Sequence, residues 1–172
     1  MAMIPPKRAL PLPPAVLPAR AATLRVPPVI QAKQIAMQTR LYQNLRPLAQ
    51  PDTKREEIFT LQQQFGTYGM RGRGGRGHYV PNARYVFVRT QSGETLMHPR
   101  LRHPVLAQGA PVMYAGEAYF ESGALRWWSN GSGHYRPDPE HAPQAGLPLD
   151  KFRTWDDVIR RGARPVGKQG PK

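Results

Sequence analysis

The chain of 172 residues contains no cysteine. That absence excludes a disulfide framework, a zinc site built on thiolates and a cysteine nucleophile. It does not decide the compartment, because a cysteine-free chain suits both the cytosol and export through an oxidising space. Long apolar runs are also missing. No stretch approaches the ~18 residues that a membrane-spanning helix needs, so we expect no membrane span.

The N-terminus lacks the continuous apolar core of a signal peptide. Lys7 and Arg8 supply the positive charge with which such a peptide begins, but prolines between Pro11 and Pro18 interrupt the apolar residues that follow. If the protein leaves the cell, we expect it to be secreted or injected without a cleavable signal peptide.

Acidic residues are scarce: 11 Asp and Glu stand against 25 Lys and Arg, a net charge of +14. A field of that size favours polyanions such as nucleic acid, an anionic membrane or an acidic partner. Residues 1–60 carry 9 basic and 3 acidic side chains, residues 61–105 carry 7 and 1, and residues 106–172 carry 9 and 7. The excess therefore lies N-terminally, and we expect a polyanion, nucleic acid or nucleotide, as a partner.

Proline is abundant, and half of the 20 prolines lie between Pro5 and Pro51. Proline removes backbone donors and favours extended conformations, which predicts a disordered, basic leader over residues 1–28. Residues 29–65 are predicted to be helical. One apolar stripe runs from Ile30 to Leu45, and a second helix is predicted from Thr53 to Phe65, with Gly66 ending it.

Residues 66–77 are rich in glycine and arginine and are predicted to be a loop. Arg71, Arg73 and Arg76 give this segment an RGG-type character, and Tyr68 and Tyr79 flank it as candidate stacking groups for nucleic acid. A basic hinge with no ligand is the alternative interpretation.

Residues 78–162 predict a β-rich domain, and residues 163–172 a flexible tail. Strands are predicted at 85–89, 95–98, 112–120 and 125–129, separated by glycine-containing turns. A helix follows at 155–161, capped by Thr154 and ended by Gly162, with acids in its first turn and arginines in its last. The predicted fold class is α+β: a small antiparallel β-meander with a C-terminal helix, preceded by the leader and one or two short helices.

Three residues are candidates for catalysis. Glu117 lies in an apolar strand, so it either faces solvent or is buried with a partner such as His134 or Arg136. A buried pair of that kind could tune a general acid or base. His134 precedes Tyr135 in a glycine-flanked turn, although a histidine that only holds the turn is an equal alternative. His98, His103, Glu117 and His134 also suit a metal by ligand type, but their spacing matches no metal motif, and no cofactor is indicated.

Two motifs carry a family resemblance over about 60 residues. Ala115-Gly116-Glu117 followed by Ser132-Gly133-His134-Tyr135-Arg136-Pro137 resembles a domain of bacterial polymorphic toxin and effector C-termini, with a related pattern in plant IQ-motif, calmodulin-binding proteins. The serines that usually follow the first histidine are replaced by Pro104 and Val105, which leaves Glu117, His134 and Tyr135 as the matched positions. Residues 27–33 also resemble leaders of proteins associated with contractile injection systems.

The resemblance implies a bacterial effector or toxin-type domain delivered by a secretion or injection apparatus that residues 1–60 would contact. Action on nucleotide or nucleic acid would suit the positive charge. ADP-ribosyl transfer is one possibility, although its arginine-serine-glutamate signature cannot be assigned. One alternative is a non-enzymatic nucleic-acid-binding protein that uses Arg71, Arg73, Arg76, Arg84, Arg100 and Arg102. A further alternative is a structural or adaptor component that docks through its leader.

Overall fold

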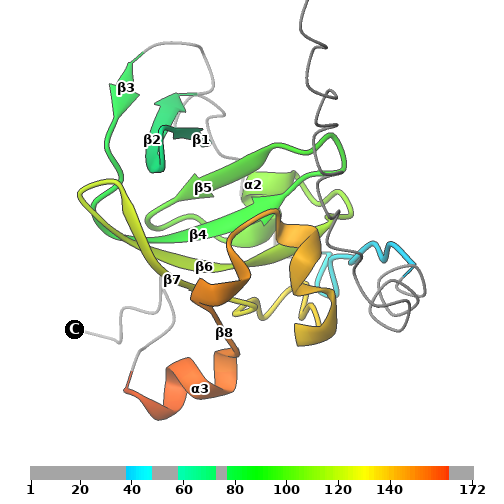
Figure 1. Cartoon of the computed structure of the whole chain (residues 1–172). Helices are drawn as coiled ribbons and strands as arrows, with labels where there is room; N and C mark the ends of the chain where they lie inside the picture. Colours follow the sequence, from blue (N-terminus) through cyan, green and yellow to red (C-terminus); the bar gives the residue numbers. More distant parts are fainter. Residues whose placement is uncertain (1–37, 48–57, 73–76, 163–172) are drawn as a thin grey trace, which may run out of the picture. The chain divides into compact units, whose positions relative to one another are not determined.

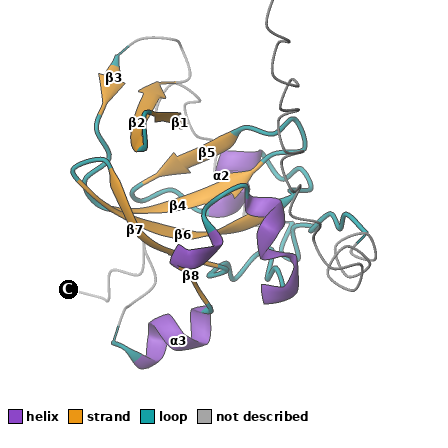
Figure 2. Cartoon of the chain, viewed as in Figure 1, coloured by secondary structure: helices purple, strands orange, loops and turns teal. Residues whose placement is uncertain are grey.

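The structure, a computed structural model, describes residues 38–47, 58–72 and 77–162. These residues form one mixed sheet of eight strands with a few short helices (Figures 1 and 2). The strands are β1 (Phe59–Gln64), β2 (Thr67–Gly72), β3 (His78–Tyr79), β4 (Arg84–Arg89), β5 (Thr95–His98), β6 (Tyr114–Glu121), β7 (Ala124–Ser129) and β8 (Phe152–Arg153). The helices are α2 (His103–Ala107), the 3₁₀ helices η2 (Pro139–Ala145) and η3 (Leu149–Lys151), and α3 (Trp155–Arg160). The predicted leader, most of the first predicted helix and the predicted tail lie outside the described residues.

The sheet confirms the predicted β-rich fold with a C-terminal helix and extends it. Its strand order is β3-β2-β1-β5-β4-β6-β7-β8, so β6 pairs with β4 rather than with β5, which precedes it. Every pairing is antiparallel except that of β7 with β8, which is parallel and makes the sheet mixed. The four predicted strands correspond to β4, β5, β6 and β7. The predicted C-terminal helix corresponds to α3, where the Thr154 side chain accepts a hydrogen bond from the Asp157 backbone.

The predicted second helix and the first part of the predicted glycine-arginine loop are wrong, because β1 and β2 form a hairpin there. The two strands pair up to Gln64 and Thr67, and the two-residue turn between them has positive φ at both Phe65 (49°) and Gly66 (81°). This is the turn that matches the twist of a two-stranded hairpin. The apolar spacing from residue 58 to 65 fits a helix by coincidence. The alternation of buried Tyr68 and Met70 with more exposed neighbours on β2 is the pattern that indicates a strand.

The described end of the first predicted helix is also extended rather than helical. Tyr42 and Val112 form an isolated antiparallel bridge, with hydrogen bonds of 2.9 and 3.0 Å exchanged between their backbones. Further along, the Leu45 backbone nitrogen donates to the carbonyl oxygen of His134 at 2.8 Å. Residues 38–46 therefore cross the domain as an extended segment. We call this the strap.

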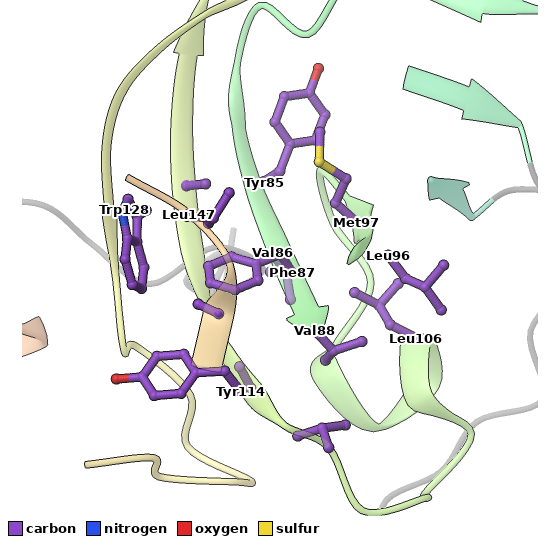
Figure 3. Packing of buried hydrophobic residues seen from close by; sticks show 14 of the residues in the cluster. Tyr85, Val86, Phe87, Val88, Leu96, Met97, Leu106, Tyr114, Trp128 and Leu147 are labelled. Atoms are coloured by element: carbon purple, nitrogen blue, oxygen red, sulfur yellow. The ribbon is translucent and has the colours of Figure 1, made fainter. Parts of the chain in front are cut away.

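The core covers both faces of the sheet at β4, where the consecutive residues Tyr85, Val86, Phe87 and Val88 are all buried. On the face of Phe87, aromatic rings meet edge to face (Figure 3). The Trp128 ring centroid lies 6.2 Å from that of Phe87 and 6.0 Å from that of Tyr114. The sheet curls because the turn between β6 and β7 returns to β2, where the Tyr68 nitrogen donates to the Gly123 oxygen at 2.8 Å. None of the helices in the described part of the chain is long and apolar enough to cross a membrane.

Candidate functional site

Glu117 is buried on β6 and forms an ion pair with Arg84 on the neighbouring strand β4. Glu117 is 3% exposed, and Arg84 Nε donates to its Oε2 at 2.7 Å while Nη2 contacts the same oxygen. The two residues are diagonal neighbours, because Val86 is the residue paired directly with Glu117. The sequence suggested His134 or Arg136 as the partner of a buried Glu117. The partner is Arg84, which reaches it from β4.

Two indole rings enclose the Arg84 side chain. Its guanidinium carbon lies 5.4 Å from the ring centroid of Trp127 and 5.7 Å from that of Trp155, within the range of cation–π attraction. Trp155 begins α3, so the same cation links β4, β6, β7 and the terminal helix. Arg84 was a predicted anion-binding residue, but the structure shows its charge already compensated by a carboxylate. Arg84 therefore has a structural role: it connects the strands of the sheet to the terminal helix.

His103 begins α2 and bonds to β6 one residue before Glu117. It is 6% exposed, and its Nε2 lies 2.8 Å from the carbonyl oxygen of Gly116. A carbonyl can only accept, so Nε2 carries the hydrogen. Burial lowers the pKa of His103 to about 4, against a smaller opposing effect of the Gly116 hydrogen bond. The ring is therefore neutral near pH 7.

His134 and Tyr135 lie in the turn after β7 in different environments. Tyr135 is buried, its hydroxyl donates to the Ala110 oxygen at 2.9 Å, and burial raises its pKa to about 12. His134 is half-buried, and burial together with the positive charges of Arg102 and Arg46 lowers its pKa. Tyr135 is thus held as a structural side chain. His134 is the more accessible of the predicted catalytic residues.

The residues that carry the family resemblance converge around the end of the β6–β7 ladder. Glu117 pairs directly with Ser129 of β7, and the turn from Asn130 to Tyr135 follows at once. His134 lies close enough to His103 to lower the pKa of His103 slightly, after the larger effect of burial, and His103 bonds to the residue before Glu117. Among the described residues, no group of three or more His, Asp or Glu side chains is placed to hold a metal ion.

The predicted anion-binding arginines divide into several groups. Arg71 on β2 and both Arg100 and Arg102, in the turn between β5 and α2, are exposed. Arg73 and Arg76 lie outside the described residues. The three exposed arginines remain candidates for contact with a polyanion.

Aromatic rings lie next to two of these arginines. The Phe59 ring stacks on His98 with centroids 6.2 Å apart and planes at 19°, and Tyr79 meets Phe59 edge-on at 5.3 Å. A hollow of about 470 Å³ is lined by Phe59, His98, Arg100 and Leu101. On the adjoining strands, Arg71 Nη2 lies 3.4 Å from His78 Nε2. We call Phe59, Tyr79, His98, Arg71 and Arg100 the aromatic–arginine surface.

Sequence reasoning found only part of this surface. Of the two predicted stacking groups, Tyr79 is 51% exposed, whereas Tyr68 is buried with its ring 5.5 Å from that of Phe120. Phe59 was missed because its segment was read as a helix. The alternation of Phe59 and Leu61 along β1 could have revealed it. No protein-family model, no curated protein and no solved structure shows a significant match to the chain.

Proposed function

We propose that this protein binds single-stranded nucleic acid through the aromatic–arginine surface. The observation that carries the proposal is the arrangement of three rings, Phe59, Tyr79 and His98, with Arg100 lining the same hollow as Phe59 and His98. Tyr79 is exposed, and Phe59 and His98 are partly buried. Aromatic rings that solvent reaches beside cations are the combination on which unpaired bases stack while their phosphates are neutralised.

The chemistry of the surface suits unpaired strands better than duplex. Stacking on one aromatic side chain contributes roughly 1–3 kcal/mol per base and needs a base whose face is free. Arg71 and Arg100 would contact phosphates, and a net charge of +14 adds a long-range attraction for any polyanion. A preference for single strands therefore separates this proposal from charge attraction alone.

The test is fluorescence anisotropy with the full chain, a labelled single-stranded oligonucleotide and its duplex, over a range of salt concentrations. We expect tighter binding of the single strand, and Tyr79→Ala to weaken it by roughly 5- to 150-fold, the stacking contribution of one base. Arg100→Gln should reduce the steepness of the salt dependence by about 0.7 in log K against log salt. Arg161→Gln removes the same charge from the end of α3 and is the matched control.

The outcome that contradicts the proposal is equal affinity for single strand and duplex with no effect of Tyr79→Ala. That result would assign the binding to net charge alone. Absence of binding at low salt would exclude the surface altogether.

A second proposal is a toxin-type effector whose site includes His134, delivered by an apparatus that the N-terminal residues contact. Its support is the resemblance, the bond of His103 to the residue before Glu117, and the turn carrying His134 that follows the pairing of Glu117 with the last residue of β7. Induced expression of the full chain in bacteria and yeast tests it. We expect growth arrest that His134→Ala relieves and that His78→Ala, a change at an exposed histidine, leaves in place. Arrest by neither wild type nor variants, at matched protein levels, would count against the effector.

A further inference from the structure

A second hollow lies between the turn after β7 and α3. These segments adjoin β7 and β8, at the opposite end of the strand order from β1 and β2. Its volume is about 450 Å³, within the ~300–1,000 Å³ that small-molecule sites occupy. Side chains from both segments line it, among them Ser132, Arg136, Trp155, Asp156 and Arg160. None of these belongs to the aromatic–arginine surface.

The walls of this hollow are held by one hydrogen bond within the turn after β7 and one between that turn and α3. Asn130 Nδ2 donates to the Pro137 oxygen at 2.9 Å, and Asn130 Oδ1 accepts from the Trp155 nitrogen at 2.8 Å. Gly131 lies directly against the indole, since a Cβ on it would be 2.4 Å from the Trp155 ring. The turn and the first turn of α3 are therefore locked in one arrangement before any ligand arrives, which lowers the cost of binding.

The hollow carries charged side chains that the described residues leave outside any ion pair. Among the residues that the structure describes, Arg136 and Arg160 form no ion pair, and the same holds for Asp156. Arg136 has a left-handed backbone with φ of 45°, and its Nε donates to the Gly133 oxygen at 3.3 Å. A non-glycine residue in that conformation is strained, and such strain concentrates at functional sites.

From this arrangement we propose that the hollow binds a phosphorylated nucleoside. Arg136 and Arg160 supply two guanidinium groups for the phosphate, for which their forked donors are well shaped. The part of the Trp155 indole that borders the hollow, away from its contacts with Arg84 and Gly131, packs against the base. The Asp156 carboxylate accepts hydrogen bonds from ribose hydroxyls or a base amino group. One carboxylate beside two cations and an indole fits a ligand that carries an anion, a ring and donors together. The site stands independently of the surface proposed for nucleic acid.

Isothermal titration calorimetry of the full chain tests the site with AMP, ADP, adenosine and inorganic phosphate as separate probes. We expect AMP or ADP to bind, and adenosine and phosphate each to bind at least tenfold more weakly, because each lacks one half of the recognised group. Arg136→Gln and Arg160→Gln should each weaken nucleotide binding at least tenfold. Arg161→Gln, at the residue that follows α3 and is not part of the lining, should change it less than twofold.

Several results would overturn the proposal. Inorganic phosphate binding as tightly as AMP would reduce the site to a simple anion site. Arg161→Gln weakening AMP as much as Arg160→Gln would assign the effect to net charge. No heat with any probe, from a protein whose thermal unfolding is cooperative, would exclude the site. Arg100→Gln should leave AMP binding intact, and Arg160→Gln should leave oligonucleotide binding intact. The two proposals can therefore be contradicted independently of each other.

Discussion

Arg84 and Glu117 compensate each other inside the domain, with Arg84 Nε 2.7 Å from Glu117 Oε2 across strands β4 and β6. The carboxylate is almost wholly buried, and the guanidinium lies between the rings of Trp127 and Trp155. A buried charge pair costs desolvation on both sides. Removing one partner of the pair lowers stability much more than replacing both partners with apolar groups.

We therefore expect Glu117→Gln to lower the free energy of unfolding by about 3–5 kcal/mol, since it leaves the Arg84 charge uncompensated. The double substitution Arg84→Met with Glu117→Leu should recover most of that loss. Urea unfolding followed by tryptophan fluorescence measures both. If Glu117→Gln keeps full stability yet relieves growth arrest, the carboxylate belongs to a reaction, and the structural role assigned to it is wrong.

His103 should make stability depend on pH between 7 and 5. Its pKa falls from 6.5 to about 4 on folding, mainly through burial, so the unfolded chain takes up the proton more readily than the native one. Stability is then full above pH 6.5 and is lost as pH falls toward 4. This amounts to about 2 kcal/mol between pH 7 and pH 5.

The measurement is the urea midpoint of the wild type at pH 7 and pH 5 beside that of His103→Gln. Glutamine can still donate to the Gly116 oxygen but does not titrate, so the variant should lose less stability on acidification. An equal loss in both proteins would place the pH dependence elsewhere.

How far the sequence predicted the fold depended on local signals. Strands β4 to β7 are short runs rich in apolar residues and bounded by turn residues. Helix α3 has a capping threonine and a terminal glycine, so each of these elements could be predicted from a short window. The β1–β2 hairpin gives two competing local signals, because the alternation of Phe59 and Leu61 fits a strand while the spacing of Ile58, Leu61 and Phe65 satisfies a helical period as well. Long-range pairing with β5, where Phe59 faces Met97, decides in favour of the strand.

The candidate sites were less predictable, because partners come from distant positions. Arg84 and Glu117 are 33 residues apart, and only the β4–β6 pairing, which skips β5, makes them neighbours. Arg136 and Arg160 line the same hollow beside α3. The segments that carry them are connected through Asn130, a residue of a type common in turns, which accepts a hydrogen bond from the Trp155 nitrogen. No short window of sequence contains that relationship.

Asp138 anchors the strap, and Tyr42 is its main hydrogen-bond partner there. Burial would raise the pKa of Asp138, but hydrogen bonds from Tyr42 and His141 outweigh it and hold the pKa at about 2. The resulting stability is present above pH 4 and is lost as pH falls toward 2. Tyr42→Phe removes the hydroxyl hydrogen bond and should cost about 1–3 kcal/mol, as for other bonds to a charged group.

The readout for the strap is hydrogen exchange at the backbone of residues 38–46. In Tyr42→Phe we expect faster exchange at Tyr42 and at Leu45, whose nitrogen bonds to the His134 oxygen, with β6 amides unchanged. Tyr119→Phe removes a hydroxyl bonded to an exposed carboxylate and serves as control. Protection of the strap that persists in Tyr42→Phe would show that its backbone bonds to Val112 and His134 and the contacts of Arg40 hold it without the Tyr42 hydroxyl.

Two glycines in one turn offer a matched pair of substitutions. A Cβ on Gly131 would lie 2.4 Å from the Trp155 ring, whereas a Cβ on Gly133 meets nothing within 4 Å. Gly131→Ala must push the indole away and should cost about 1–3 kcal/mol, as overpacking does. Gly133→Ala should change stability by less than about 0.5 kcal/mol, as surface substitutions do.

Because Trp155 also contacts Arg84 and lines the hollow, Gly131→Ala should disturb more than stability. We expect a shift in tryptophan emission, faster hydrogen exchange in α3 and weaker nucleotide binding, with oligonucleotide binding kept. Gly133→Ala should preserve the tryptophan emission, the hydrogen exchange of α3 and oligonucleotide binding. If Gly131→Ala instead matches Gly133→Ala in urea midpoint and emission, then α3 is not packed on the turn as the Trp155–Gly131 contact requires, and the walls of the hollow are not fixed in advance.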